Sequence, residues 1–73
     1  MKESAFEILE RELGQSSALG ILNELIGERM KEEHPEYGEL DATERERLWY
    51  AYCQKFTGKN AEALLRPYVE ENL

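Results

Sequence analysis

The sequence lacks the residues that staple a small fold. Its 73 residues include one cysteine, Cys53, and one histidine, His34. A single cysteine cannot close a disulfide within the chain, and one cysteine with one histidine cannot complete a four-ligand zinc site. Because a core of this size rarely contributes more than ~3–5 kcal/mol, helix packing or self-association must stabilise the fold.

Long apolar runs are also missing. The opening residues MKESAFEILE contain no apolar run of the length found in signal peptides, and no later segment approaches the ~18 apolar residues of a membrane-spanning helix. The unpaired thiol of Cys53 suits a reducing compartment. We therefore expect a cytoplasmic protein that makes no contact with membranes.

Basic residues are too few to balance the acidic ones. Sixteen Asp and Glu residues against nine Lys and Arg residues give a net charge of −7. This charge repels phosphate backbones, so we expect no direct binding of nucleic acid, whereas a basic partner would be attracted. A net charge of ~2–8 in magnitude is also ordinary for a soluble small domain.

Catalytic and metal-binding patterns are absent as well. The sequence has no glycine-rich phosphate loop, no Ser/His/Asp set and no zinc-type spacing. Cys53 falls within a predicted helix and His34 in a predicted loop, so the thiol has no base nearby. The acidic segment EEHPEYGELD does not match a calcium-binding loop. We expect no enzymatic activity, no cofactor and no metal site.

What the sequence does contain is helical periodicity. Hydrophobic residues make up 41% of the chain and charged residues 34%, which is typical of a folded domain. Ser4 and Glu7 form a capping-box pattern at the start of a first helix, and Gly14 ends it. The apolar stripe expected on this helix consists of Ala5, Phe6, Leu9 and Leu13.

A second helix is predicted from Ser16 or Ser17 to about His34, because Pro35 steers the preceding residue out of the helical region. The loop HPEYGEL follows, with Pro35 and Gly38 favouring turns. The apolar stripe of the second helix consists of Ala18, Leu22, Leu25, Ile26 and Met30.

Two further helices follow. Two capping registers fit the start of the third helix equally well, Asp41 with Glu44 and Thr43 with Glu46. The third helix should reach Phe56 or Thr57 and end at a left-handed Gly58, after which Asn60 caps a fourth helix. Pro67 predicts a kink or break in that helix near Arg66. The sequence thus predicts an all-α fold, a compact bundle of about four short helices in a single domain.

Aromatic residues concentrate in the third helix, in the segment RERLWYAYCQKF at residues 45–56. Turning the chain by ~100° per residue places Leu48, Trp49, Tyr52 and Phe56 on one side, with Cys53 at its margin. We interpret this stripe as core. Tyr50 points the other way, beside Arg47 and Gln54, and is the best single candidate for a partner contact because tyrosine and arginine are enriched at binding hot spots.

The second helix carries two further candidate surfaces. Gly20 and Gly27 share a side with Asn23 nearby, and two glycines on one helix side suggest that a second backbone packs there, from another copy in a homodimer or from a partner. The alternative is that the helix merely tolerates both glycines. An acidic ridge stands with its carboxylates about 6 Å apart along the axis. The ridge consists of Glu24, Glu28 and Glu32. More often such a run of charges is only a solvated helix face.

These features predict an interaction module or regulator, an adaptor or inhibitor that binds a basic or nucleic-acid-binding protein. The alternative is an acidic mimic of nucleic acid that blocks the DNA- or RNA-binding cleft of another protein. A structural homodimer joined through its glycine-bearing side is the third hypothesis.

Overall fold

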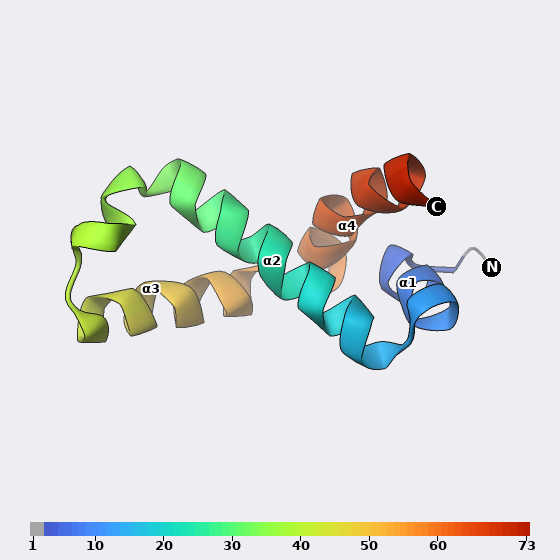
Figure 1. The fold of residues 1–73 in the computed structure, drawn as a ribbon, viewed down its shortest axis with the longest axis horizontal. Coiled ribbons are helices and arrows are strands. Elements are labelled where there is room, and N and C mark those ends of the chain that lie inside the picture. The colour runs from blue at the N-terminus through green and yellow to red at the C-terminus, as the bar shows by residue number, and fades with distance from the viewer. Residues whose placement is uncertain (1–2) are drawn as a thin grey trace.

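The computed structural model describes residues 3–73, which form four α-helices and one short 3₁₀ helix with no strand (Figure 1). The elements are α1 (Ala5–Leu13), α2 (Gln15–Glu33), η1 (Pro35–Glu39), α3 (Ala42–Lys55) and α4 (Gly58–Asn72). The prediction of an all-α bundle is confirmed. The bundle is elongated, with principal dimensions of 42 × 20 × 19 Å.

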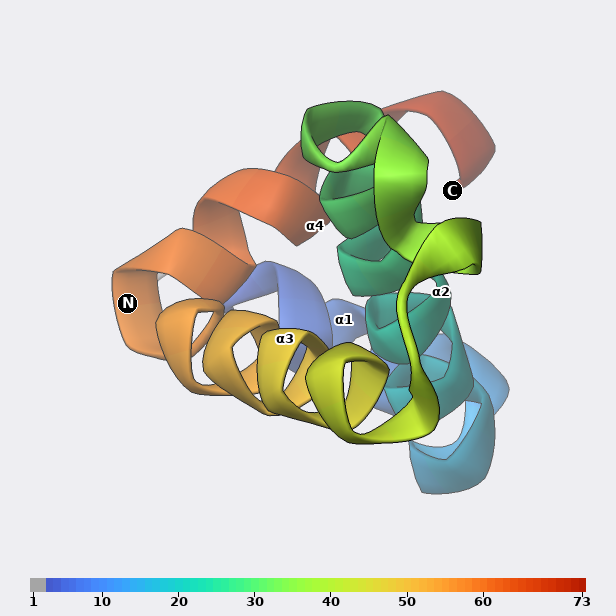
Figure 2. The same cartoon turned by 90° about the vertical axis from the view of Figure 1, so that its left-hand side faces the viewer.

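The long helix α2 is the axis of the molecule. α1 and α4 pack against each other and against α2 at one end, whereas α3 begins at the other end and runs back along α2 (Figures 1 and 2). The short η1 closes the connection from α2 to α3 and contacts α2. The fold therefore has a three-helix end, formed by α1, α4 and the first half of α2, and a hairpin end, formed by the second half of α2, η1 and α3.

Side-chain caps fix the starts of two helices. Ser4 Oγ accepts a hydrogen bond from the Glu7 amide at 3.1 Å, and the Glu7 carboxylate accepts one from the Ser4 amide at 3.3 Å, so the predicted capping box is confirmed. Asp41 caps α3 by accepting from the Glu44 amide at 2.9 Å. The alternative register through Thr43 is wrong because the backbone is already helical from Ala42 onwards.

The predicted start of α2 is wrong by one or two residues, and the predicted loop after α2 is partly helical. α2 begins at Gln15, directly after Gly14, and neither Ser16 nor Ser17 caps it. The turn is this short because Gly14 adopts a φ of +92°, a conformation that residues with a β-carbon rarely take. The segment expected to be a plain loop contains η1, with Pro35 in its first turn, where a missing amide proton costs no hydrogen bond.

The junction of α3 and α4 is tighter than predicted. Gly58 has the expected positive φ, +53°, but it is already the first residue of α4, so Asn60 lies inside this helix and does not cap it. The side-chain amide of Asn60 (Nδ2) instead donates to the carbonyl oxygen of Lys55 at 2.9 Å, which satisfies an acceptor at the end of α3.

α4 runs through Pro67 without a break, so the break, one of the two predicted outcomes near Arg66, does not occur. The proline leaves the carbonyl of Ala63, four residues earlier, without its helical partner. Both Ala63 and Pro67 are exposed, so water can bond to this carbonyl and the helix continues.

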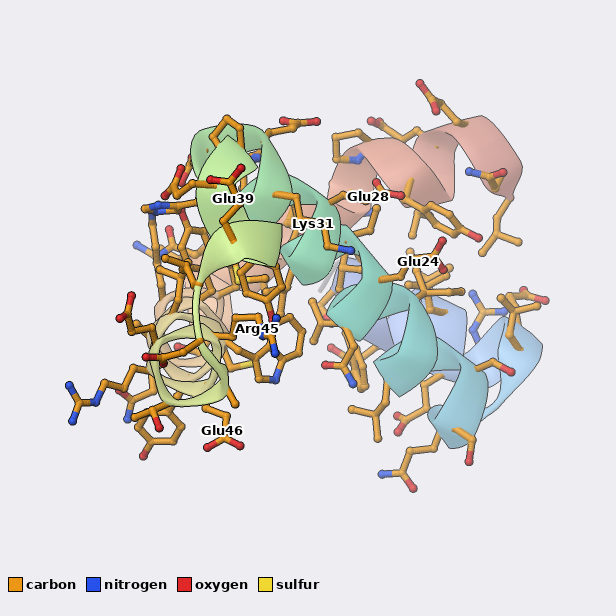
Figure 3. The ribbon with its side chains drawn as sticks, turned by 60° about the vertical axis from the view of Figure 1, so that its left-hand side comes forward. Glu24, Glu28, Lys31, Glu39, Arg45 and Glu46 are labelled. Carbon is orange, nitrogen blue, oxygen red and sulfur yellow. The ribbon has the colours of Figure 1, made fainter. Side chains whose placement is uncertain are left out.

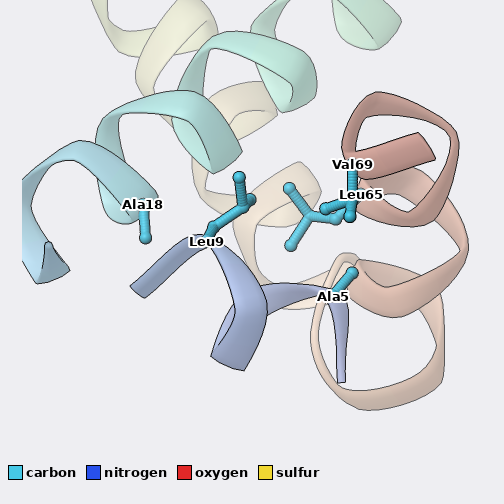
Figure 4. Packing of buried hydrophobic residues seen from close by; sticks show 5 residues of the cluster. All are labelled: Ala5, Leu9, Ala18, Leu65 and Val69. Carbon is cyan, nitrogen blue, oxygen red and sulfur yellow. The ribbon is translucent and has the colours of Figure 1, made fainter. Parts of the chain in front are cut away.

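The three-helix end has its own core, in which side chains from α1, α2 and α4 converge (Figure 4). This three-helix core consists of Ala5, Leu9, Ala18, Leu65 and Val69. Phe6 packs against its edge. Leu13, predicted to belong to the same stripe, is 44% exposed because it lies in the last turn of α1, beyond the buried part of that helix.

The hairpin end has a second core, which contains the predicted aromatic stripe. This hairpin core consists of Ile26, Met30, Tyr52 and Phe56. Leu48 and Trp49 pack against it while remaining partly exposed, and Cys53 is half-buried at the margin, as the spacing predicts. Leu22 of α2 contacts both cores and joins the two ends of the molecule.

Candidate interaction surface

An apolar hollow of about 500 Å³ opens at the three-helix end and extends to the junction of α3 and α4. We call it the apolar groove. Its apolar lining consists of Phe6, Leu19, Leu22, Ala61 and Leu65. Its remaining lining consists of Ser4, Thr57, Gly58 and Glu62. Small-ligand sites commonly measure ~300–1,000 Å³, so the groove is large enough to take several apolar groups.

The apolar groove is open although its lining includes part of the core. Leu65, one of the lining residues, is fully buried, whereas Leu19 is 45% exposed. Residues 15–23 of α2 contain no charged side chain, so the α2 wall is neutral. Because apolar side chains line an open hollow, the groove is a candidate contact site.

A polar network holds the edge of the apolar groove in place. The Glu62 carboxylate on α4 accepts a hydrogen bond from the Ala5 amide at 2.7 Å and another from Arg66 Nε at 2.9 Å. Arg66 also donates to the carbonyl oxygen of Glu3 at 3.1 Å. The Ala5 amide and then Arg66 lower the pKa of Glu62. This carboxylate therefore fastens the start of α1 to α4.

The sequence gives little sign of the apolar groove. The only signal is Leu19, which widens the apolar surface of α2 beyond its main stripe. The hollow itself depends on where α1 and α4 meet α2, and no spacing within one helix reveals that meeting point.

A second hollow, of about 470 Å³, lies at the hairpin end, between α2, η1 and α3. It is lined by Asn23, Glu24, Gly27, Glu28, Met30, Lys31, Tyr37 and Trp49. Four of the predicted contact residues on α2 therefore come together there, while Gly20 and Glu32 lie outside it.

The two glycines of α2 have different surroundings. A β-carbon placed on Gly27 would lie 3.8 Å from the Trp49 ring, so a side chain of α3 in the same chain already packs at this glycine. Gly20 is exposed, with no heavy atom within 4 Å of such a β-carbon. Of the two glycines, therefore, only Gly20 has space beside it for the close approach of another molecule.

The acidic ridge on α2 is exposed along its length. The carboxylates of Glu24, Glu28 and Glu32 make no hydrogen bond or ion pair with any side chain among residues 3–73. Lys31 lies on the same side of α2 and is close to Glu28 (Figure 3). The ridge is thus interrupted by a positive charge.

The outward side of α3 carries the other predicted contact residues. Tyr50 is 64% exposed, as its spacing predicts, and its hydroxyl accepts a hydrogen bond from the side-chain amide of Gln54 (Nε2) at 3.2 Å. Arg47 is exposed and lines a shallow hollow that also includes Leu40 and Leu48. The role of these residues in binding stays a prediction.

Three further findings concern thiol reactivity, metal ligation and membrane spanning in the described part of the chain. Burial raises the pKa of the Cys53 thiol, which disfavours the reactive thiolate. Among residues 3–73, no three His, Cys, Asp or Glu side chains are grouped so that they could hold a metal ion. None of the helices described for these residues combines the length and apolar character needed to cross a membrane.

Comparisons with protein families, with curated proteins and with solved structures give no match to this chain. The interaction surface therefore has to be assessed from its own geometry and charge.

Proposed function

We propose that this protein is a non-enzymatic, cytoplasmic regulator that acts by binding a basic partner protein. The observation that carries the proposal is the apolar groove. The fold buries Leu9 and Leu65 completely, yet it leaves Leu19 nearly half exposed at an open hollow. Burying such a surface against a partner would be favourable, since apolar area removed from water contributes about 25 cal/mol per Å².

The net charge of −7 supports the choice of a basic partner. Opposite charges accelerate the encounter of two proteins, whereas apolar contacts at the centre of an interface sustain the complex. If charge attraction and apolar contacts both contribute to binding, the association rate should fall as salt increases, while a large part of the affinity persists.

Affinity capture followed by reconstitution tests this proposal. The protein would be used as bait in a cytoplasmic lysate, and the partner would be purified and measured against it at low and high salt. The proposal requires direct binding of one basic protein that survives high salt, with a slower association rate. It fails if no purified protein binds the bait directly.

Variants of the exposed residues identify the contact surface. Reversing the charges of Glu24, Glu28 and Glu32 together should slow association, and Tyr50→Ala should weaken binding if the outward side of α3 takes part. Unchanged association after charge reversal would contradict the electrostatic part of the proposal.

A second candidate function, mimicry of nucleic acid, is supported by the free carboxylates of the acidic ridge. Lys31 within the ridge weakens this support (Figure 3). Mimicry would be favoured by complete loss of binding at high salt together with a harmless Tyr50→Ala substitution. A homodimer would instead be favoured by light scattering that gives twice the chain mass at all concentrations, and Gly20 would be the first residue to substitute.

A further inference from the structure

We infer that the apolar groove receives the apolar side of a basic amphipathic helix from the partner protein. This inference rests on the proposed function and specifies the place and manner of binding. The supporting observations are the secondary structure around the groove, the exposure of its lining and the charges on the three helices that form its walls, α1, α2 and α4.

The secondary structure limits how a peptide can bind. An extended peptide adds to the edge of a sheet, and residues 3–73 form no strand that could offer such an edge. A proline-rich segment docks between several aromatic side chains, whereas Phe6 is the only aromatic residue that lines the groove. A helix laid in an apolar groove fits better than these two modes, because the lining is apolar and the walls of the groove are themselves helices.

The exposure of the lining shows which side chains such a helix would contact. Leu19 is 45% exposed on the α2 wall, and Phe6 is partly exposed on the α1 wall. An amphipathic helix presents apolar side chains at positions i, i+3, i+4 and i+7, and these would fill the hollow between α1, α2 and α4. Leu19 and Phe6 would lose their contact with water.

The charges of the walls favour a basic helix. The α2 wall is neutral, and α1 carries three glutamates against one arginine, a net charge of −2. The third wall, α4, carries three glutamates against Lys59 and Arg66, a net charge of −1. The arginine of α1, Arg11, is already paired with Glu3 at 2.9 Å and with Glu12 at 2.7 Å. Glu10 follows Phe6 by one helical turn and therefore lies on the same side of α1. Glu10 makes no ion pair with another residue of 3–73. Lysine or arginine at the edge of a docked helix would meet this carboxylate.

Synthetic peptides provide the direct test. The first is a leucine and lysine helix with an apolar side, the second carries glutamate in place of every lysine, and the third contains the residues of the first in an order that destroys the apolar side. Binding to the full chain would be measured by amide chemical-shift changes in NMR spectra and by titration calorimetry.

The inference requires that the first peptide bind at least about tenfold more tightly than the other two, which corresponds to ~1.4 kcal/mol. Its shift changes should concentrate at Phe6, Leu19, Leu22 and Ala61. Equal binding of the lysine and glutamate peptides would overturn the preference for a basic helix. Shift changes centred on Tyr50 or on the acidic ridge would overturn the groove as the docking site.

A matched pair of variants provides the second test. Leu19→Asp places a charge in the groove, while Leu13→Asp makes the same change at a leucine of equal exposure that does not line the groove. Leu19→Asp should weaken binding of the lysine peptide about tenfold or more, and Leu13→Asp less than about twofold. Equal effects of the two variants would contradict the inference. Circular dichroism would establish that both variants remain folded.

The same variants separate this inference from the proposed function. If the purified partner protein binds Leu19→Asp as tightly as it binds the unaltered chain but loses affinity for Tyr50→Ala, the groove is wrong and the regulator function stands. If no basic protein binds the unaltered chain at all, the proposed function itself fails.

Discussion

The two ends of the molecule differ in how firmly they are built. In the three-helix core, Ala5, Leu9, Ala18 and Leu65 have no exposed surface, and α1 packs against both α2 and α4. In the hairpin core the buried residues keep between 2% and 7% exposure, and α3 packs chiefly against α2. A segment held mainly by one neighbour opens at a lower free energy than one held by two. The apolar groove is thus walled by helices of the firmer end.

Each end also has a polar contact between helices that depends on ionisable side chains. At the three-helix end the Glu62 carboxylate accepts from the Ala5 amide, which lowers the pKa of Glu62. At the hairpin end the Tyr52 hydroxyl donates to the Glu33 carboxylate, and this bond raises the pKa of Tyr52 to about 12. The first contact needs an ionised acid, and the second needs both a neutral phenol and an ionised acid, because the bond from Tyr52 also lowers the pKa of Glu33. Acid should therefore weaken both ends, whereas alkali should weaken only the hairpin end.

The largest expected effect comes from the three-helix core. Leu9→Ala should reduce the free energy of unfolding by about 2–5 kcal/mol, because Leu9 is fully buried and its loss leaves a cavity. A domain of this size has only ~3–5 kcal/mol from its core, so most of the variant should be unfolded. Urea denaturation followed by circular dichroism measures this. Leu13→Ala on the same helix, where the leucine is exposed, should cost less than about 1 kcal/mol and serves as the control.

A smaller, local effect is expected at the hairpin end. Trp49→Ala removes a partly exposed ring that packs against Gly27 and the hairpin core, so the cost should be about 1–2 kcal/mol, below the ~3–5 kcal/mol of a fully buried ring. Hydrogen exchange should accelerate in α3 while α1 and α4 keep their protection. Equal acceleration at both ends would show that the molecule unfolds only as one unit.

Alkaline pH should weaken the hairpin end selectively. Tyr52 has an ordinary pKa of 10.0 that rises to about 12 in the fold, so its stabilising contribution is complete below pH 10 and is lost as the pH rises towards 12. Absorbance of the ionised tyrosines should show one late titration. Tyr52→Phe should remove both that titration and the associated loss of stability, whereas Tyr50→Phe, at the exposed tyrosine, should leave the late titration in place.

Acid pH should weaken the three-helix end by the smallest amount. The pKa of Glu62 in the fold lies below its ordinary value of 4.5, so its contribution is present above pH 4.5 and is lost as the pH falls through the lowered pKa. Glu62→Gln should reduce the dependence of stability on pH in this range. Glu70→Gln, an exposed position on the same helix, should leave it unchanged, and thermal unfolding at several pH values would distinguish them.

The sequence predicted the features that depend on neighbouring residues. The caps at Ser4 and Asp41 and the outward direction of Tyr50 follow from spacing within one helix, and the structure confirms them. The predicted cap at Asn60 is wrong because the tight α3–α4 junction places this residue inside α4. The predicted burial of Leu13 is wrong because this residue lies at the end of α1, beyond the buried part of the helix. The apolar groove could not be predicted, since residues far apart along the chain form it.

Hydrogen exchange of the protein alone and in complex with its purified partner tests the central claim most directly. The claim is that a firm three-helix end presents the binding groove while the hairpin opens more readily. In the free protein, α3 should exchange before α1 and α4, and in the complex the added protection should fall on α1, residues 15–22 and the start of α4. Uniform exchange in the free protein, or protection gained only in α3 around Tyr50, would contradict it.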